Sequence, residues 1–265
     1  MRNRFIFTML SAFLLYGVKI DAQTAVQKTI ELDIPEQLKN YNSRFCFVGN
    51  ELIMPANGGL YSLSSNVWIE KPDSNDFLLS FQLSPDQKNS FFSVYHKRTQ
   101  KTVVYSKSSA DQKTVIIASL PPGFFYVKNI ESSIFIYGSD EHAFHIYEAK
   151  GDALNSLYSS ATFVPNSLMF LNSEIVLLAF GDRIVSLSKN EGLQELVHLN
   201  DGISSFAVLD NNALFVTTPQ GLCLYQDNKL KVLEPGLDGE LTLLKETLFL
   251  FSKTRKKLLV YKVSR

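Results

Sequence analysis

The stretch "DEHAFH" (Asp140–His145) holds the densest group of potential metal ligands in the chain. Asp140, Glu141, His142 and His145 lie within six residues, and carboxylate and imidazole groups are ligands that zinc and similar ions accept. The stretch falls on a turn between two predicted strands. Because a metal site needs three or four converging ligands and a hairpin tip alone rarely supplies them, we expect a solvated turn and no metal site. These four residues are the weak candidates for one.

Motifs for nucleophilic, zinc and phosphate chemistry are missing from the sequence. It contains no Gly-x-Ser-x-Gly, no His-Glu-x-x-His and no glycine-rich loop that ends in Gly-Lys-Ser/Thr. We therefore assign no catalytic residue and no cofactor. A site assembled from scattered strand ends would carry no such motif. A hydrolase, lyase or cyclase with one Ca²⁺ is therefore the alternative to a non-enzymatic role.

Polar side chains recur where such a calcium-dependent enzyme would need them, near the ends of several predicted strands. The residues are Asn50, Asn129, Asn172, Asp210 and Glu246. Their position also fits a tight turn, because Asn and Asp tolerate left-handed backbone geometry and bond to neighbouring backbone groups. We favour the turn interpretation.

Short apolar runs recur along the chain with a period near 40 residues. One run in each group begins at Leu52, Phe91, Ile134, Ile175, Leu214 and Leu248, so the separations are 39, 43, 41, 39 and 34 residues. Each has one run before it and one after it, and the first five groups add a fourth. Runs of four to eight apolar residues bounded by Gly, Asn, Asp and Pro are typical of strands, and this period is typical of a repeat architecture.

Six groups of four antiparallel strands predict an all-β fold, a six-bladed β-propeller that forms a single domain over residues 23–265. Five or seven blades are the alternatives. The last group has only three runs. The segment Lys28–Ile34 alternates apolar and charged residues as a half-buried strand does. We expect it to supply the outermost strand of the last blade and close the ring.

The stretch "ISSFAVLDNNALFVTTPQGLCLYQDNKLKVLE" (Ile203–Glu234) shows such a group in full. It resembles the blades of bacterial β-propeller repeat proteins, in the broad class that includes NHL, YVTN and two-component-regulator propellers. The resemblance covers nearly all of residues 23–265. It implies a fold and does not imply a function, because propellers host unrelated activities.

The repeat register also bears on the two cysteines. Cys46 falls in the first group and Cys223 in the fifth. In a six-bladed ring the sixth group lies between them, so their Cα atoms should be farther apart than the roughly 7 Å that a disulfide tolerates. We expect two reduced thiols and no disulfide.

The N-terminus has the pattern of a secretory signal peptide. Two arginines in "MRNR" precede the apolar run Phe5–Val18, and the small residue Ala22 precedes Gln23. We predict cleavage after residue 22, which would leave no membrane span, and export to the periplasm or the cell exterior. An uncleaved N-terminal anchor is the alternative.

The balance of charged residues limits which classes of partner the chain can bind. The chain has 26 basic and 26 acidic side chains, which argues against nucleic acid, since that partner needs a basic excess. The favoured function is an exported, non-enzymatic protein-interaction or scaffold module of the bacterial cell envelope with a protein partner. The alternative is the propeller enzyme described above.

Overall fold

The computed structural model describes residues 24–38, 45–48, 51–151, 153–210, 213–252 and 254–264. Regular structure within these ranges consists of 23 strands, β1 to β23, so the predicted all-β class is confirmed. No helix that could cross a membrane is found in the described part of the chain. The predicted signal peptide, residues 1–22, lies outside it.

The chain divides into two compact units. We call Asp33–Ser205 the central unit. Met1–Leu32 together with Phe206–Arg265 form the terminal unit.

The terminal unit contains two four-stranded antiparallel sheets. One has the order β17-β18-β19-β20, with β17 (Ser205–Asp210), β18 (Ala213–Thr218), β19 (Gly221–Gln226) and β20 (Lys229–Pro235). The other has the order β1-β23-β22-β21, with β1 (Ala25–Asp33), β21 (Glu240–Leu244), β22 (Thr247–Ser252) and β23 (Lys257–Ser264).

The strand β1 pairs the two ends of the chain within this second sheet. It occupies the edge beside β23, where the Thr29 hydroxyl donates a hydrogen bond of 3.0 Å to the Val260 carbonyl. Lys257 and Lys28 both bind the Glu31 carboxylate and lower its pKa to about 2. All but the last residue of the predicted closing segment therefore lie in an edge strand of this sheet.

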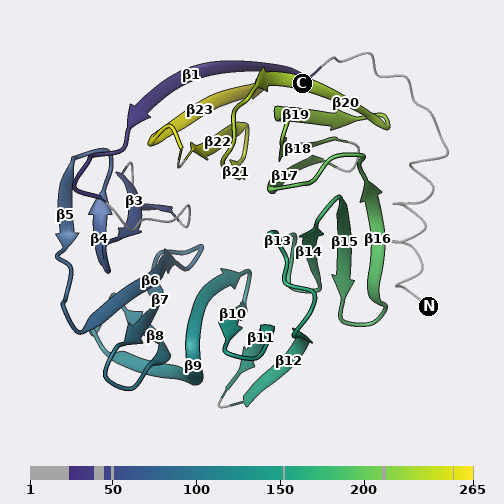
Figure 1. Ribbon diagram of the computed structural model, residues 1–265. Helices are drawn as coiled ribbons and strands as arrows, with labels where there is room; N and C mark the ends of the chain where they lie inside the picture. The colour runs from purple at the N-terminus through teal and green to yellow at the C-terminus, as the bar shows by residue number, and fades with distance from the viewer. Residues whose placement is uncertain are drawn as a thin grey trace. The chain divides into compact units, whose positions relative to one another are not determined.

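The central unit contains three sheets (Figure 1). The first has the order β2-β3-β4-β5, with β2 (Cys46–Val48), β3 (Glu51–Ala56), β4 (Gly59–Ser62) and β5 (Val67–Glu70). The last has the order β13-β14-β15-β16, with β13 (Ser167–Phe170), β14 (Ile175–Phe180), β15 (Arg183–Ser188) and β16 (Gly192–His198). The middle sheet has seven strands in the order β12 to β6, with β6 (Asp76–Leu83), β7 (Asn89–His96), β8 (Lys101–Ser108), β9 (Thr114–Ile130), β10 (Ser133–Asp140), β11 (Phe144–Lys150) and β12 (Ala153–Ser160).

The seven-stranded sheet corrects the predicted six groups of four strands, because one boundary between groups falls within Thr114–Ile130. The structure has one strand of 17 residues, β9, which pairs with β8 up to Pro122 and with β10 from Gly123 onward. Figure 1 shows it as one long curved ribbon. Proline fits an extended backbone, so Pro121 and Pro122 do not reverse the chain. A Cβ at Gly123 would lie 2.4 Å from the Ser139 carbonyl of β10, so only glycine allows this close approach.

The described residues thus form five sheets, four of four strands and one of seven, in place of six separate four-stranded groups. Several hairpin turns contain the Asn and Gly residues that mark strand ends in the sequence. Asn57 and Gly58, between β3 and β4, both have positive φ, 51° and 88°, as a tight hairpin turn with a right-handed twist requires.

Candidate functional site

The acidic and histidine-rich hairpin is built around one carboxylate. Asp140 Oδ1 accepts hydrogen bonds from the backbone N–H groups of His142 (2.7 Å) and Ala143 (2.8 Å), and Oδ2 lies 3.0 Å from His145 Nε2. Burial opposes ionisation, but these bonds hold the pKa of Asp140 below its usual value. Glu141 and His142 are exposed at the tip. The structure therefore brings together Asp140 and His145 as a turn support.

Two of the recurring polar residues at strand ends, Asn172 and Asn129, bond to groups in turns. Asn172 Oδ1 accepts hydrogen bonds from the backbone N–H groups of Glu174 (2.8 Å) and Ile175 (2.9 Å). Asn129 Nδ2 donates to the Ser133 carbonyl at 3.3 Å. Asn50 lies outside the described residues. Within the described ranges, no three His, Cys, Asp or Glu side chains are grouped as metal ligands.

Cys46 and Cys223 are both free thiols. Cys223 is buried, and Cys46 is half-buried. Burial raises the pKa of Cys46 to about 11. A thiol with a raised pKa is a poor nucleophile and a poor metal ligand, so Cys46 is not a reactive thiol, and burial keeps Cys223 out of contact with solvent.

The strands β6 to β9 present two unlike faces. The face toward β10 is covered, and its residues are buried: Phe91, Ser93, Thr102, Val104, Ala118 and Leu120. On the opposite face Phe92, Val94, Val103 and Tyr105 are only half-buried, and Ile116 is 62% exposed. We call this opposite face the half-covered face. An antiparallel sheet can leave one face in water, but that face is then usually polar, so the exposed apolar residues distinguish this one.

Among the described residues, the sheet that faces the half-covered face is the smaller of the two. The strands β2 to β5 have three to six residues, whereas β6, β7 and β8 have eight each. Their contact is a small apolar cluster around Ile53, Leu60 and Leu78. Beyond this cluster lies a groove of about 600 Å³ whose floor includes Phe92 and Tyr105.

A polar chain crosses the floor of this groove. Asp76 Oδ1 lies 2.8 Å from His96 Nδ1, and His96 Nε2 lies 3.1 Å from the Tyr105 hydroxyl. Burial and the charge of Asp76 raise the pKa of Tyr105. The phenol therefore stays neutral and acts as a hydrogen-bonding group. The order of the three groups resembles that of a catalytic triad, but the raised pKa of Tyr105 disfavours a phenolate nucleophile.

Cations lie at both ends of the half-covered face. Lys101 and Arg98 line a second hollow of about 660 Å³ that shares Asp76 and His96 with the first. Lys107 lines the far end of the first groove. Within the described ranges, the side chains of Arg98, Lys101 and Lys107 have no hydrogen-bond or ion-pair partner. These cations are available to a ligand.

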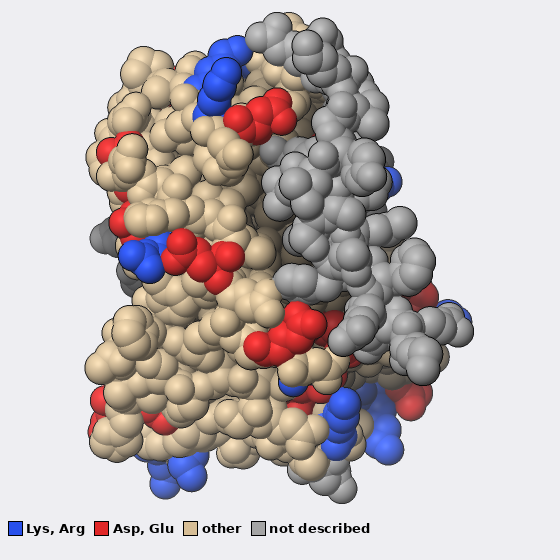
Figure 2. Space-filling view, turned by 90° about the vertical axis from the view of Figure 1, so that its right-hand side faces the viewer, with Lys and Arg blue, Asp and Glu red and all other residues tan. Residues whose placement is uncertain are grey.

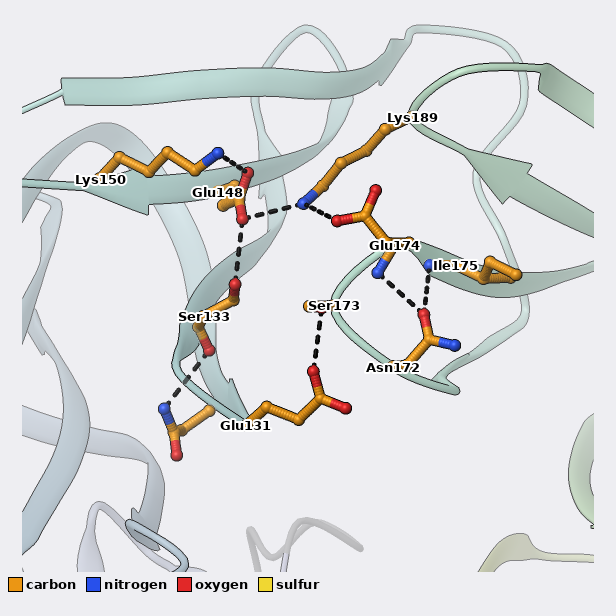
Figure 3. Close-up of polar contacts among 10 residues, drawn as sticks. Glu131, Ser133, Glu148, Lys150, Asn172, Ser173, Glu174, Ile175 and Lys189 are labelled. Atoms are coloured by element: carbon orange, nitrogen blue, oxygen red, sulfur yellow. Dashed lines mark hydrogen bonds and ion pairs between the residues drawn. The ribbon is translucent and has the colours of Figure 1, made fainter. Parts of the chain in front are cut away.

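We call the packed region between two neighbouring sheets a junction. The junction between β2–β5 and β6–β9 is open at the groove, whereas the junction between β9–β12 and β13–β16 is closed. Phe135, Ile146 and Leu178 are buried within one apolar cluster there. At its edge Glu148, which is 2% exposed, accepts hydrogen bonds from Lys189 Nζ (2.9 Å) and the Ser133 hydroxyl (3.1 Å). Figure 3 shows Lys189 reaching both Glu148 and Glu174. Aromatic packing and ion pairs fill this junction.

Charge elsewhere is mixed. Figure 2 shows acidic and basic side chains scattered over one face with uncharged surface between them, and neither sign forms a broad patch among the coloured atoms. Both signs of charge are therefore mixed among the coloured residues of this face.

The half-covered face was missed in the sequence because both faces of β7 and β8 are apolar. "SFFSVYHK" and "TVVYSKS" do not show which face meets a neighbour. Two signals were present: the short runs of the first group, and Lys101 and Lys107 at even spacing on one face of a strand.

Comparison with known proteins supports the fold and leaves the function open. No protein-family model and no curated protein matches this sequence. The extracellular domain of BT4673 from B. thetaiotaomicron is similar in structure, with a TM-score of 0.51 and 13% identity over 90% of this chain. The match covers 40% of that chain, so this protein spans about two fifths of its length.

Two other solved structures resemble the chain. One belongs to a nidogen/laminin complex, with a TM-score of 0.57 and 12% identity over 77% of this chain and 86% of that one. The other belongs to a mitotic checkpoint complex, with a TM-score of 0.56 and 9% identity over 94% and 96%. Identities this low show the fold alone, which is β-propeller-like. The NHL and YVTN resemblance stays a prediction.

Proposed function

We propose that this chain is an exported, non-enzymatic β-propeller of six blades that binds a protein partner in the bacterial cell envelope. If the two halves of β9 count as strands of different blades, the five sheets become six groups of four. The edge strand β1 completes the last group, as a ring closed by the chain's two ends requires. Closure in this way protects sheet edges.

Export is supported by the N-terminal sequence pattern and by the extracellular domain among the similar structures. N-terminal sequencing of the protein purified from its native source tests this part. We expect the mature chain to begin at Gln23. A chain that retains Phe5–Val18 would instead be held by an uncleaved anchor.

The half-covered face carries the proposal of a binding role. It combines half-buried aromatic residues, a groove of about 600 Å³ and cations without partners in the described chain. Exposed apolar surface of this kind, rimmed by polar groups, is typical of interaction sites on soluble proteins. Tyr and Phe are also enriched where proteins bind each other.

Site-specific photo-crosslinking tests this role. A photoreactive phenylalanine analogue replaces Ile116, which lies opposite Tyr105 on the adjacent strand. The control replaces Leu193 on β16, which is similarly exposed at 52%. We expect one discrete protein adduct in the native envelope from position 116 and none from position 193. Equal labelling at both positions, or none at 116, would contradict a specific docking surface.

A further inference from the structure

The half-covered face has a repeating pattern that a ligand can match. Lys101, Val103, Tyr105 and Lys107 alternate along β8 and share one side of it. With a rise of about 3.3 Å per residue, the two lysines stand about 20 Å apart and the apolar residues lie between them. The face is therefore basic at both ends and apolar in the middle.

The neighbouring strand β7 continues the apolar part of this pattern. His96 lies opposite Lys101, Val94 opposite Val103, and Phe92 opposite Tyr105. The rings of Phe92 and Tyr105 stack with their centroids 5.2 Å apart. Phe92 and Val94 already pack in part against the cluster around Ile53, Leu60 and Leu78. The apolar surface left to an extended segment therefore centres on Val103 and Tyr105 of β8, with Ile116 of β9 beside them.

We infer that the partner docks on this face through an extended acidic segment, with two carboxylates about six residues apart and apolar side chains between them. The inference rests on the proposed function. An extended chain places alternate side chains on one side at the same interval as β8, so one segment can meet the lysines and the apolar rows together.

Charge complementarity favours an acidic segment over a basic one. Asp76 is the acidic residue in the rows described, and it is already bonded to His96. The opposite wall of the groove contributes Glu70, Lys71 and Asp73, so its charges are mixed. A basic segment would bring its cations against Lys101, Lys107 and Arg98, and like charges at such distances repel.

The test uses two synthetic peptides with the mature full-length chain. The acidic probe is acetyl-Glu-Ser-Val-Ser-Phe-Ser-Glu-amide, and the basic probe has Lys in place of both Glu residues. We expect saturable binding of the acidic probe by fluorescence polarisation. The double variant K101E/K107E should bind the acidic probe about tenfold more weakly and should bind the basic probe in its place, as reversed ion pairs predict.

The matched control is the double variant K229E/K231E. It makes the same charge change on the exposed lysines of β20, and it should leave the affinity for the acidic probe unchanged. An equal loss in both double variants would mean a net-charge effect and would overturn the inference.

Failure of this inference is distinguishable from failure of the proposed function. If the photoreactive residue at position 116 yields a protein adduct but neither probe responds to K101E/K107E, the face binds a partner without an acidic segment. If position 116 yields no adduct, the docking role itself is wrong. Preferential binding of the basic probe to the unmodified chain would also overturn the inference.

Discussion

Two junctions between sheets of the central unit contain similar aromatic residues but bury them to different extents. Between β9–β12 and β13–β16, Phe135, Phe144 and Phe170 are buried together. Between β2–β5 and β6–β9, Phe92 and Tyr105 stack on each other but stay half-buried. Among the described residues, the first sheet meets its neighbour through the small cluster around Ile53, Leu60 and Leu78, whereas seven buried residues form the cluster of the closed junction.

The charged groups of the two junctions also differ, because the buried carboxylate of the closed junction is paired, whereas two cations of the open junction are not paired within the described chain. In the closed junction Glu148 is buried, and a buried carboxylate is tolerated only when several donors bind it. In the open junction the cations Lys101 and Lys107 have no partner in the described chain. The closed junction is therefore built for stability, and the open one carries the proposed docking face.

The largest test of this contrast truncates one phenylalanine in each junction. Phe135 is 1% exposed, so F135A should lower the free energy of unfolding by about 3–5 kcal/mol through lost packing and a cavity. F92A removes the same atoms from the half-covered face and should cost about 1 kcal/mol, because water already reaches that ring. Urea unfolding measures both. Equal losses would mean that the two junctions are packed alike.

The second test removes one cation from the closed junction. K189M leaves Glu148 with only Lys150 and Ser133 as partners, and we expect a loss of about 2 kcal/mol, below the usual cost of breaking a buried pair because two donors remain. Lys150 binds the same carboxylate at 3.2 Å but is largely exposed, so the control K150M should cost under about 1 kcal/mol. The reverse order in urea unfolding would place the main stabilising contact at Lys150.

The pH dependence of stability gives a third test at Glu148. Burial would raise its pKa, but hydrogen bonds from Lys189, Lys150 and Ser133 outweigh burial and hold the pKa below its usual value. Its ionisation therefore stabilises the fold fully above the ordinary glutamate pKa of about 4.3 and stops doing so as the pH falls through the lowered value. The stability gap between the wild type and E148Q should be full at pH 7 and narrower at pH 3. A gap of constant size at both pH values would show that the charge contributes nothing.

Sequence patterns predicted the class and the repeat of this fold because both depend on local information. Alternating apolar runs and turn residues such as Asn57 and Gly58 mark strands and hairpins directly. The continuous strand β9 was not predicted. Pro121, Pro122 and Gly123 are typical of turns, and only the pairing of the flanking residues with β8 and β10 shows that the chain stays extended.

The candidate site was beyond the sequence for a different reason. Whether Phe92 is covered depends on how far the neighbouring sheet extends, and Lys101 is notable only because no described side chain pairs with it. The polar residues that sequence patterns did single out, Asp140 and Asn172, support turns. A pattern of residue types shows which chemistry the side chains could perform. Whether they form a site depends on which residues lie beside them in three dimensions.

The smallest expected effect concerns the hydroxyl of Tyr105. Y105F keeps the ring stacked on Phe92 and deletes only the hydrogen bond to His96, which keeps its contact with Asp76. Because the site is half-exposed, water can replace the lost group, and urea unfolding should show a loss under about 1 kcal/mol. In the closed junction the comparable deletion S133A takes a hydroxyl from the buried Glu148 and should cost more. If Y105F proves the more destabilising change, the polar chain Asp76–His96–Tyr105 holds the open junction together, and the division between a stabilising and a binding junction fails.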